Sequence, residues 1–157
     1  MEREVELVAF RRELAPHFKE LNEAWLEKYF TIEPKDVEVL GDPEAYIINK
    51  GGYIYFARVG NEIVGTFALI PEREGVYELG KMAVKEEYQG QNIGNKLLQY
   101  CLEEARALDA AKVILYSNTI LAPAIHLYKK WGFVEVPMGA SEYKRSNIKM
   151  EHVITTK

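Results

Sequence analysis

A glycine-containing turn connects a predicted strand that ends at Val84 to a long predicted helix. The turn reads QGQNIG over residues 89–94. Backbone N–H groups of such a turn point in one direction, and the start of the following helix adds roughly half a positive charge. These features favour the binding of an anion such as a pyrophosphate. The alternative is a tight turn that needs glycine for its geometry alone.

The spacing of the glycines differs from that of two common nucleotide-binding motifs. Gly90 and Gly94 lie four residues apart, which does not match GxGxxG, and no Lys-Ser or Lys-Thr pair follows as in a P-loop. A second polar position, Asn118, follows a short apolar strand. After it comes the sequence PAIHLYKKWGF over residues 123–133, which begins with proline in the first turn of a helix and has glycine just past its end.

Together the two blocks resemble the GNAT superfamily of acyl-CoA-dependent N-acetyltransferases. The family turn reads Q/R-x-x-G-x-G/A, and Gln89, Asn92 and Gly94 stand at its three fixed positions. The second block is similar to the family pattern Asn…Ala-Ile-x-Leu-Tyr-x-x-x-Gly-Phe. The resemblance extends over residues 5 to 153 and implies that acetyl-CoA is the cosubstrate.

The resemblance also implies which residues bind the cofactor. These are Met82, Ala83, Val84, Gln89, Gly90, Gln91, Asn92, Gly94, Asn95, Asn118 and Tyr128. Asn92 stands where the family usually has glycine, but asparagine is the non-glycine residue that best tolerates positive φ, so we expect binding to persist. By resemblance the Met82 N–H is the oxyanion donor. Asn118 also suits the N-cap of the helix that follows it.

Acetyl transfer to an amine benefits from a proton acceptor and a proton donor. Glu78 resembles the strand glutamate that serves as base in part of the family, and strand alternation predicts that it shares a face with Met82 and Val84. Because Glu78 lies about 13 Å from Met82 along an extended strand, a water relay is favoured over direct proton abstraction. Tyr128 is the candidate acid, since a phenol of pKa ~10 is protonated at neutral pH. The alternatives are an ion-paired or solvent-facing glutamate and a core tyrosine.

The acceptor site is expected near the first helix and the late strands. Tyr29 and Phe30 are candidates to line a pocket for an apolar or cationic group. Arg145 is a candidate clamp for a substrate carboxylate, with a solvated surface residue as the alternative. We expect a small, amino-acid-like amine as acceptor, while a protein N-terminus or lysine stays open.

The rest of the chain predicts the elements that position these residues. Apolar positions at helical spacing, prolines and glycines predict helices at 16–30, 34–41, 91–108 and 123–131, and a short one that begins at Asp42-Pro43. Strands are predicted at 5–10, 53–59, 62–70, 76–84, 113–116, 133–136 and about 147–154. This order predicts one α+β domain over residues 1–157, with a mixed, mostly antiparallel sheet flanked by helices on both faces.

Composition narrows the classes of function. The chain has 157 residues and a formal net charge of −4, which disfavours nucleic acid as a partner. Its single cysteine, Cys101, is expected in the core, and its three histidines are too scattered to predict a metal site. No apolar run is long enough to cross a membrane, and the first residues do not resemble a signal peptide, so a cytoplasmic protein is expected. The oligomeric state is left open, with a homodimer as one option.

Three functions follow from these observations. The leading hypothesis is an acetyl-CoA-dependent N-acetyltransferase, favoured by the presence of both Glu78 and Tyr128. The alternative is a non-catalytic acyl-CoA-binding or sensing domain of the same fold. A dinucleotide enzyme is disfavoured, because the turn comes after an antiparallel meander and its glycine spacing is different.

Overall fold

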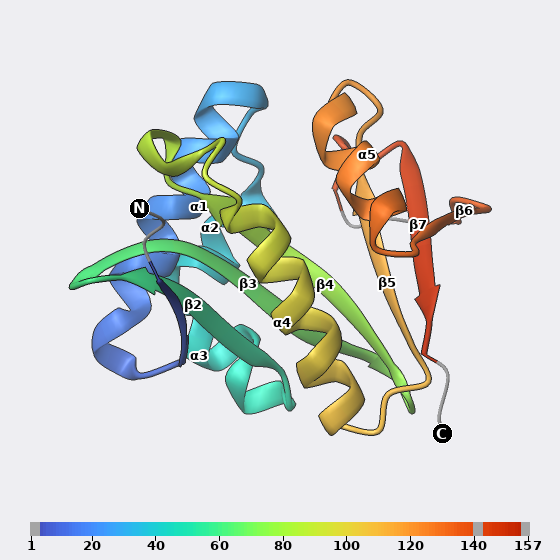
Figure 1. Cartoon of the computed structure of the whole chain (residues 1–157), viewed down its shortest axis with the longest axis horizontal. Coiled ribbons are helices and arrows are strands. Elements are labelled where there is room, and N and C mark those ends of the chain that lie inside the picture. The colour runs from blue at the N-terminus through green and yellow to red at the C-terminus, as the bar shows by residue number, and fades with distance from the viewer. Residues whose placement is uncertain (1–3, 140–142, 155–157) are drawn as a thin grey trace.

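The computed structural model describes residues 4–139 and 143–154. They form a seven-stranded sheet in the order β1-β2-β3-β4-β5-β7-β6, with helices on both faces (Figure 1). Neighbouring strands are antiparallel except β4 and β5, which are parallel. The predicted α+β class and the mixed, mostly antiparallel sheet are therefore confirmed.

The elements follow the predicted order. The strands are β1 (Val5–Ala9), β2 (Tyr53–Val59), β3 (Glu62–Arg73), β4 (Val76–Val84), β5 (Lys112–Ser117), β6 (Val134–Val136) and β7 (Ile148–Val153). The helices are α1 (Ala15–Tyr29), α2 (Pro34–Gly41), α3 (Pro43–Tyr46), α4 (Ile93–Ala107) and α5 (Ala122–Lys130), with 3-10 turns η1 (Arg12–Leu14), η2 (Ile48–Lys50) and η3 (Glu86–Tyr88). Most boundaries lie within about two residues of those predicted.

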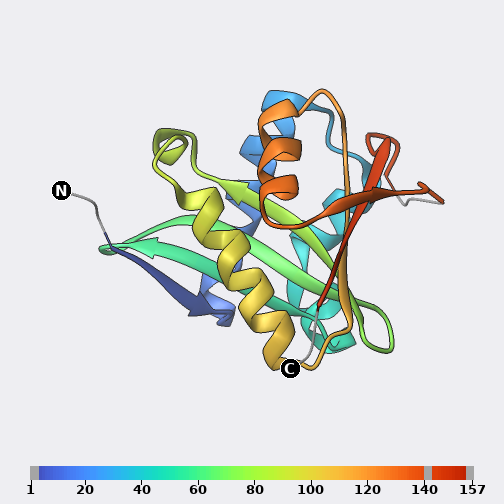
Figure 2. The ribbon, with the colours of Figure 1, turned by 45° about the vertical axis from the view of Figure 1, so that its right-hand side comes forward.

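Two hydrophobic clusters cover the two faces of the sheet. On one face, α4 packs through a stripe that includes Leu97, Leu98 and Cys101, all fully buried, and α5 packs beside it. On the other face, α1, α2 and α3 cover a second cluster that is centred on Phe18 and Phe56. Figure 2 shows α4 lying along its face of the sheet with α1 behind the strands. The sheet is thus a rigid layer from which polar residues at the strand ends project.

The parallel pair β4 and β5 separates after only three residue pairs. Pairing runs from Val76 with Lys112 to Glu78 with Ile114, and the two strands then diverge (Figure 1). On its other edge β4 carries a bulge, because Thr66 pairs with Ala83 while Ala68 pairs with Gly80. The extra residue lies at Lys81, whose φ of 53° is in the left-handed region. The bulge and the divergence together expose backbone and side chains of β4 to a space between the strands.

Because of the bulge, the orientation of Glu78 relative to Met82 and Val84 differs from the predicted one. Simple alternation along β4 placed Glu78 on the same face as Met82 and Val84. With one extra residue at Lys81, Met82 and Val84 pack against the cluster under α4, whereas Ala83 faces the cluster under α1. The prediction was wrong because a bulge shifts the period-two pattern by one residue, and nothing in the local sequence signals it.

Leu97→Ala tests the packing of α4, the helix that follows the turn at residues 89–92. Leu97 is fully buried and lies against Gly65 of β3, so we expect the free energy of unfolding to fall by about 2–5 kcal/mol. Urea denaturation at neutral pH measures this change. Glu103→Ala, at an exposed position on the same helix, is the control and should stay within about 0.5 kcal/mol of wild type. Equal stabilities for the two variants would contradict the packing described.

Candidate active site

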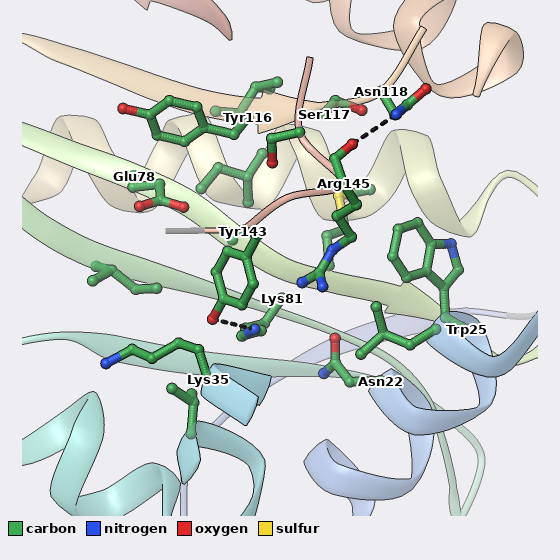
Figure 3. A pocket seen from close by; sticks show the side chains of 18 of the residues that line it. Asn22, Trp25, Lys35, Glu78, Lys81, Tyr116, Ser117, Asn118, Tyr143 and Arg145 are labelled. Carbon is green, nitrogen blue, oxygen red and sulfur yellow. Dashed lines mark hydrogen bonds between the residues drawn. The ribbon is translucent and has the colours of Figure 1, made fainter. Parts of the chain in front are cut away.

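A cavity of about 330 Å³ opens between the diverging ends of β4 and β5. Its walls come from these two strands, from α1 to η2 on one side, and from residues 143–146 (Figure 3). Glu78 and Tyr128, the two candidate catalytic residues, both line it, although they lie fifty residues apart in sequence. The fold therefore brings the predicted base and acid to a single cavity.

The predicted phosphate-binding turn is held in shape by its own side chains. Asn92 has a φ of 70°, as its tolerance of positive φ predicts, and its side-chain oxygen accepts a hydrogen bond from the Asn95 amide. The side-chain oxygen of Asn95 accepts a hydrogen bond from Trp131 Nε1 at 2.8 Å, which ties α4 to α5. Gln89 Nε2 donates to Val84 O at 3.3 Å. These contacts engage the side chains of Gln89, Asn92 and Asn95 within the protein.

Not every predicted backbone donor of the turn points to solvent. The Gln91 N–H donates to Tyr88 O at 3.3 Å and is therefore engaged. The first N–H groups of α4, beginning with Ile93 and Gly94, stand at the helix terminus, where the helix itself supplies no acceptor. A Cβ on Gly94 would lie 3.1 Å from Leu127 Cδ2 of α5, so glycine allows the close approach of the two helices.

Tyr128 reaches the cavity from α5. Its ring packs edge-on against Phe133, with ring centroids 6.0 Å apart. Burial raises the pKa of Tyr128 to about 12. The phenol is therefore protonated throughout the physiological range and is suited to donate a proton.

Glu78 lines the cavity near Tyr116 (Figure 3). Its carboxylate bends along the strand, since a Cβ on Gly80 would lie 3.4 Å from Glu78 Oε2. This brings the carboxylate closer to the bulge than its position on an extended strand suggests. Burial, with the charges of Glu72 and Glu78, raises the pKa of Tyr116, so this neighbour is uncharged at neutral pH.

A buried carboxylate, Asp36, joins three parts of the cavity wall. It lies in the first turn of α2, where it accepts the Glu33 backbone N–H at 2.9 Å and forms a capping box. Lys81 Nζ donates to Asp36 Oδ1 at 2.9 Å, and Arg145 donates to both oxygens at 2.8 Å. Lys81 also donates to the Tyr143 hydroxyl at 2.8 Å. The α2 terminus, the β4 bulge and the 143–146 segment are thus linked at one residue.

Burial and the neighbouring charged groups shift the pKa values of Asp36 and Lys81 in opposite directions. The Asp36 side chain is 0% exposed, and that of Lys81 is 8% exposed. Burial alone would raise the pKa of Asp36, but hydrogen bonds from Arg145, the Glu33 backbone and Lys81 lower it to about 2. Burial lowers the pKa of Lys81, and Asp36 opposes that shift. Asp36 therefore stays ionised at any physiological pH.

Four other predicted site residues are divided between this cavity and a second one. The Arg145 guanidinium lines the cavity but is bonded to Asp36 and lies 3.4 Å from Glu33, so it serves as part of the wall. Phe30 lines this cavity, whereas Tyr29 lines a second one beside the residues that follow β4. Asn118 lines the cavity too, but its amide donates to Arg145 O and its oxygen accepts the Ile120 N–H.

Several residues that line the cavity or hold its wall together were not predicted from the sequence. Asp36 carried a readable signal, because Glu33-x-x-Asp36 before an apolar run is a capping pattern. Lys81 carried none, since positive φ is not predictable for lysine. Tyr46, Lys35 and Lys50 belong to short elements whose position over the cavity depends on tertiary packing.

The sequence model of the acetyltransferase (GNAT) family matches residues 15–133. The chain belongs to this family. It is 30% identical over 101 residues to the uncharacterized N-acetyltransferase YvbK of Bacillus subtilis strain 168, covering 62% of this chain and 65% of YvbK, slightly under two thirds of that relative's length.

Solved structures of the GNAT fold superpose on nearly the whole chain. An acetyltransferase of the GNAT family from Staphylococcus aureus Mu50 has a TM-score of 0.85 at 21% identity, covering 97% of this chain and 100% of the other. The PaiA N-acetyltransferase of Thermoplasma acidophilum, solved in complex with coenzyme A, has a TM-score of 0.78 at 17% identity, covering 96% and 99%. At these identities the likeness establishes the fold.

Two further features concern residues 4–139 and 143–154. Their helices include none with the length and apolar character that a membrane crossing requires. Over the same residues, no group of three or more His, Cys, Asp and Glu side chains is arranged to hold a metal ion.

Asp36→Asn tests the buried ion cluster. The change leaves the buried Lys81 without its carboxylate partner and leaves Arg145 with Glu33 alone, so we expect a loss of about 3–5 kcal/mol in the free energy of unfolding at pH 7. Because the folded pKa of about 2 lies below the ordinary 3.8, the ionised carboxylate stabilises the fold above about pH 4, and this contribution is lost as the pH falls through 2. The difference between variant and wild type should therefore narrow over that range.

Urea denaturation as a function of pH measures the effect of Asp36→Asn. Glu38→Gln is the matched control, because Glu38 lies on the same helix with its side chain 54% exposed, and it should change stability by less than about 1 kcal/mol. A loss for Asp36→Asn that stays constant between pH 7 and the acid range would contradict the electrostatic explanation.

Proposed function

We propose that the protein is an acetyl-CoA-dependent N-acetyltransferase that acts on a primary amine. The observation that carries the proposal is that Glu78 and Tyr128 both line one cavity. This cavity lies between the diverging strands β4 and β5, and β4 leads to the proposed anion-binding turn. Membership of the acetyltransferase (GNAT) family supports it. A non-catalytic acyl-CoA-binding domain would have no need for an acid and a base at the same cavity.

The cofactor is proposed to lie along the end of β4 and across the start of α4. Its pyrophosphate would be bound by backbone N–H groups of residues 90 and 92–95, with the helix terminus adding partial positive charge. The pantetheine arm would follow Met82, Ala83 and Val84 into the space between β4 and β5. The similarity of the fold to PaiA, which was solved with coenzyme A, supports this arrangement.

The reaction is a direct attack of the amine on the thioester. The amine nitrogen forms a bond to the acetyl carbon, and the carbonyl oxygen takes the negative charge. Met82 has no Cα partner on β3 at the bulge, and its N–H is the proposed donor to this oxyanion. The carbon–sulfur bond then breaks, the thiolate takes a proton from Tyr128, and Glu78 accepts a proton from the amine directly or through water.

The size of the cavity favours a small acceptor. About 330 Å³ accommodates a small molecule, and it is bounded on several sides by α1, α3 and the 143–146 segment. Phe30 and Trp25 line the same space, so an apolar portion of the acceptor is also accommodated. A protein N-terminus or lysine is the alternative acceptor, to be included in the assay.

Tyr128→Phe tests the proposed acid. It removes only the hydroxyl, so we expect kcat to fall by about 10²–10⁴-fold while the Kd for CoA changes little. Release of free thiol from acetyl-CoA measures kcat, and calorimetry measures the Kd. Tyr53→Phe, a partly exposed position outside the cavity, is the control and should retain full activity. An unchanged kcat when chemistry is rate-limiting would make Tyr128 a packing residue.

Glu78→Gln tests the proposed base. The amide keeps the size of the side chain but cannot accept a proton at neutral pH, so kcat/KM should fall near pH 7. The loss should shrink at higher pH, because an amine of pKa ~10.4 is increasingly present as its free base. Glu72→Gln, on the exposed end of β3, is the control. An equal loss at every pH would indicate that Glu78 orients the substrate without removing its proton.

A further inference from the structure

Cationic residues outnumber anionic residues in the lining of the cavity, whereas anionic residues outnumber cationic ones in the whole chain. The chain carries a formal net charge of −4, yet among the described residues that line the cavity four are cationic and one is anionic. The anionic residue is Glu78. The cationic residues are Lys35, Lys50, Lys81 and Arg145.

Two of these cations are neutralised by carboxylates that lie behind the cavity wall. Lys81 and Arg145 share Asp36, and Arg145 also lies beside Glu33. These ion pairs therefore stabilise the cavity wall. The other cationic side chains that line the cavity are Lys35 and Lys50.

Lys35 and Lys50 meet at one aromatic ring. Each ammonium nitrogen lies 5.4 Å from the centroid of the Tyr46 ring, so the two charges are no more than twice that distance apart. Lys35 also lies 4.0 Å from Glu38 on the outside of α2. An ammonium group has three donors, so an anion can bind to Lys35 in addition to the partners that it already has.

Lys35 lies on the same side of the cavity as the proposed base in Figure 3, and Lys50 shares the Tyr46 ring with Lys35. Figure 3 shows Lys35 and Glu78 together at one side, with Asn118 and Trp25 at the other. An acceptor whose amine lies at Glu78 therefore extends toward Lys35 and Lys50. A second cationic group on the acceptor would meet like charge there, whereas an anionic group would meet its complement.

We propose that the acceptor is a small primary amine that also carries an anionic group, with the amine at Glu78 and the anion at Lys35 and Lys50. This proposal rests on the proposed function and names the substrate class of the same site. It transfers the role of anion clamp from Arg145, whose guanidinium is engaged by Asp36, to the lysine pair around Tyr46.

A series of amines matched in length tests the charge preference. The assay compares ω-amino carboxylates and aminoalkyl phosphates with n-alkylamines and diaminoalkanes of equal chain length, which differ only in the terminal group. We expect kcat/KM to be at least about tenfold higher for an anionic member than for the alkylamine, and lowest for the diamine. The better of the carboxylate and phosphate series identifies the anion, and the best chain length reports the span from Glu78.

Substitution of the lysines tests their role directly. In the double variant Lys35→Gln with Lys50→Gln, KM for the anionic amine should rise about tenfold or more, with kcat and the Kd for acetyl-CoA little changed. Lys50→Glu should shift the preference toward the diamine. Lys19→Gln, an exposed position on α1 outside the cavity, is the matched control. Equal or better turnover of the diamine by wild type, or an unchanged preference in the double variant, would overturn the proposal.

Failure of the proposed function gives a different result. If acetyl-CoA binds but no amine or protein lysine is acetylated, the protein is not an acetyltransferase. Calorimetry of the same amines with the protein saturated by CoA then still measures the charge preference of the cavity. Binding of the diamine as tight as that of the ω-amino carboxylate would contradict the anion site independently of turnover.

Discussion

The separation of β4 from β5 is the constraint on which the rest of the site depends. Two parallel strands that are paired throughout would leave no cavity and would commit their backbone groups to each other. Here pairing ends at Glu78, and the bulge at Lys81 turns the end of β4 further away. A left-handed backbone at lysine costs about 1–2 kcal/mol, so other interactions must hold it. The Lys81 side chain supplies them through Asp36 and Tyr143.

The buried carboxylate of Asp36 therefore has three consequences. It caps α2, it offsets the strain at the bulge, and it anchors the 143–146 segment through Arg145. Each of these elements contributes side chains to the cavity, so their relative positions are determined by one charge. A buried ion cluster gives little net stability compared with apolar packing, but it tolerates few alternative geometries. The shape of the cavity depends on it more than the overall fold does.

The elements of the fold were predictable because each has a local cause. The apolar stripe of α4 and the proline at the start of α2 are visible in the sequence, and Asn92 adopts the positive φ expected of it. The orientation of Glu78 relative to Met82 was not predictable from the sequence, because it depends on a bulge that β3 and the Asp36 cluster impose. The partner of Arg145 was missed for a similar reason, since Asp36 lies 109 residues away in sequence.

The proposed cofactor site and the proposed acceptor site present different kinds of atoms. The turn before α4 presents mainly main-chain N–H groups, which any residue except proline supplies, while the acceptor cavity is lined by side chains of α1, α2, α3 and residues 143–146. Substitutions at Lys35, Tyr46 or Lys50 can therefore accumulate without altering the main chain that holds the cofactor. Because the proposed cofactor site uses main-chain atoms and the proposed acceptor site uses side chains, the acceptor can change during evolution while the acetyl donor stays the same. Descendants of one ancestral gene can then diverge in substrate and keep the same fold.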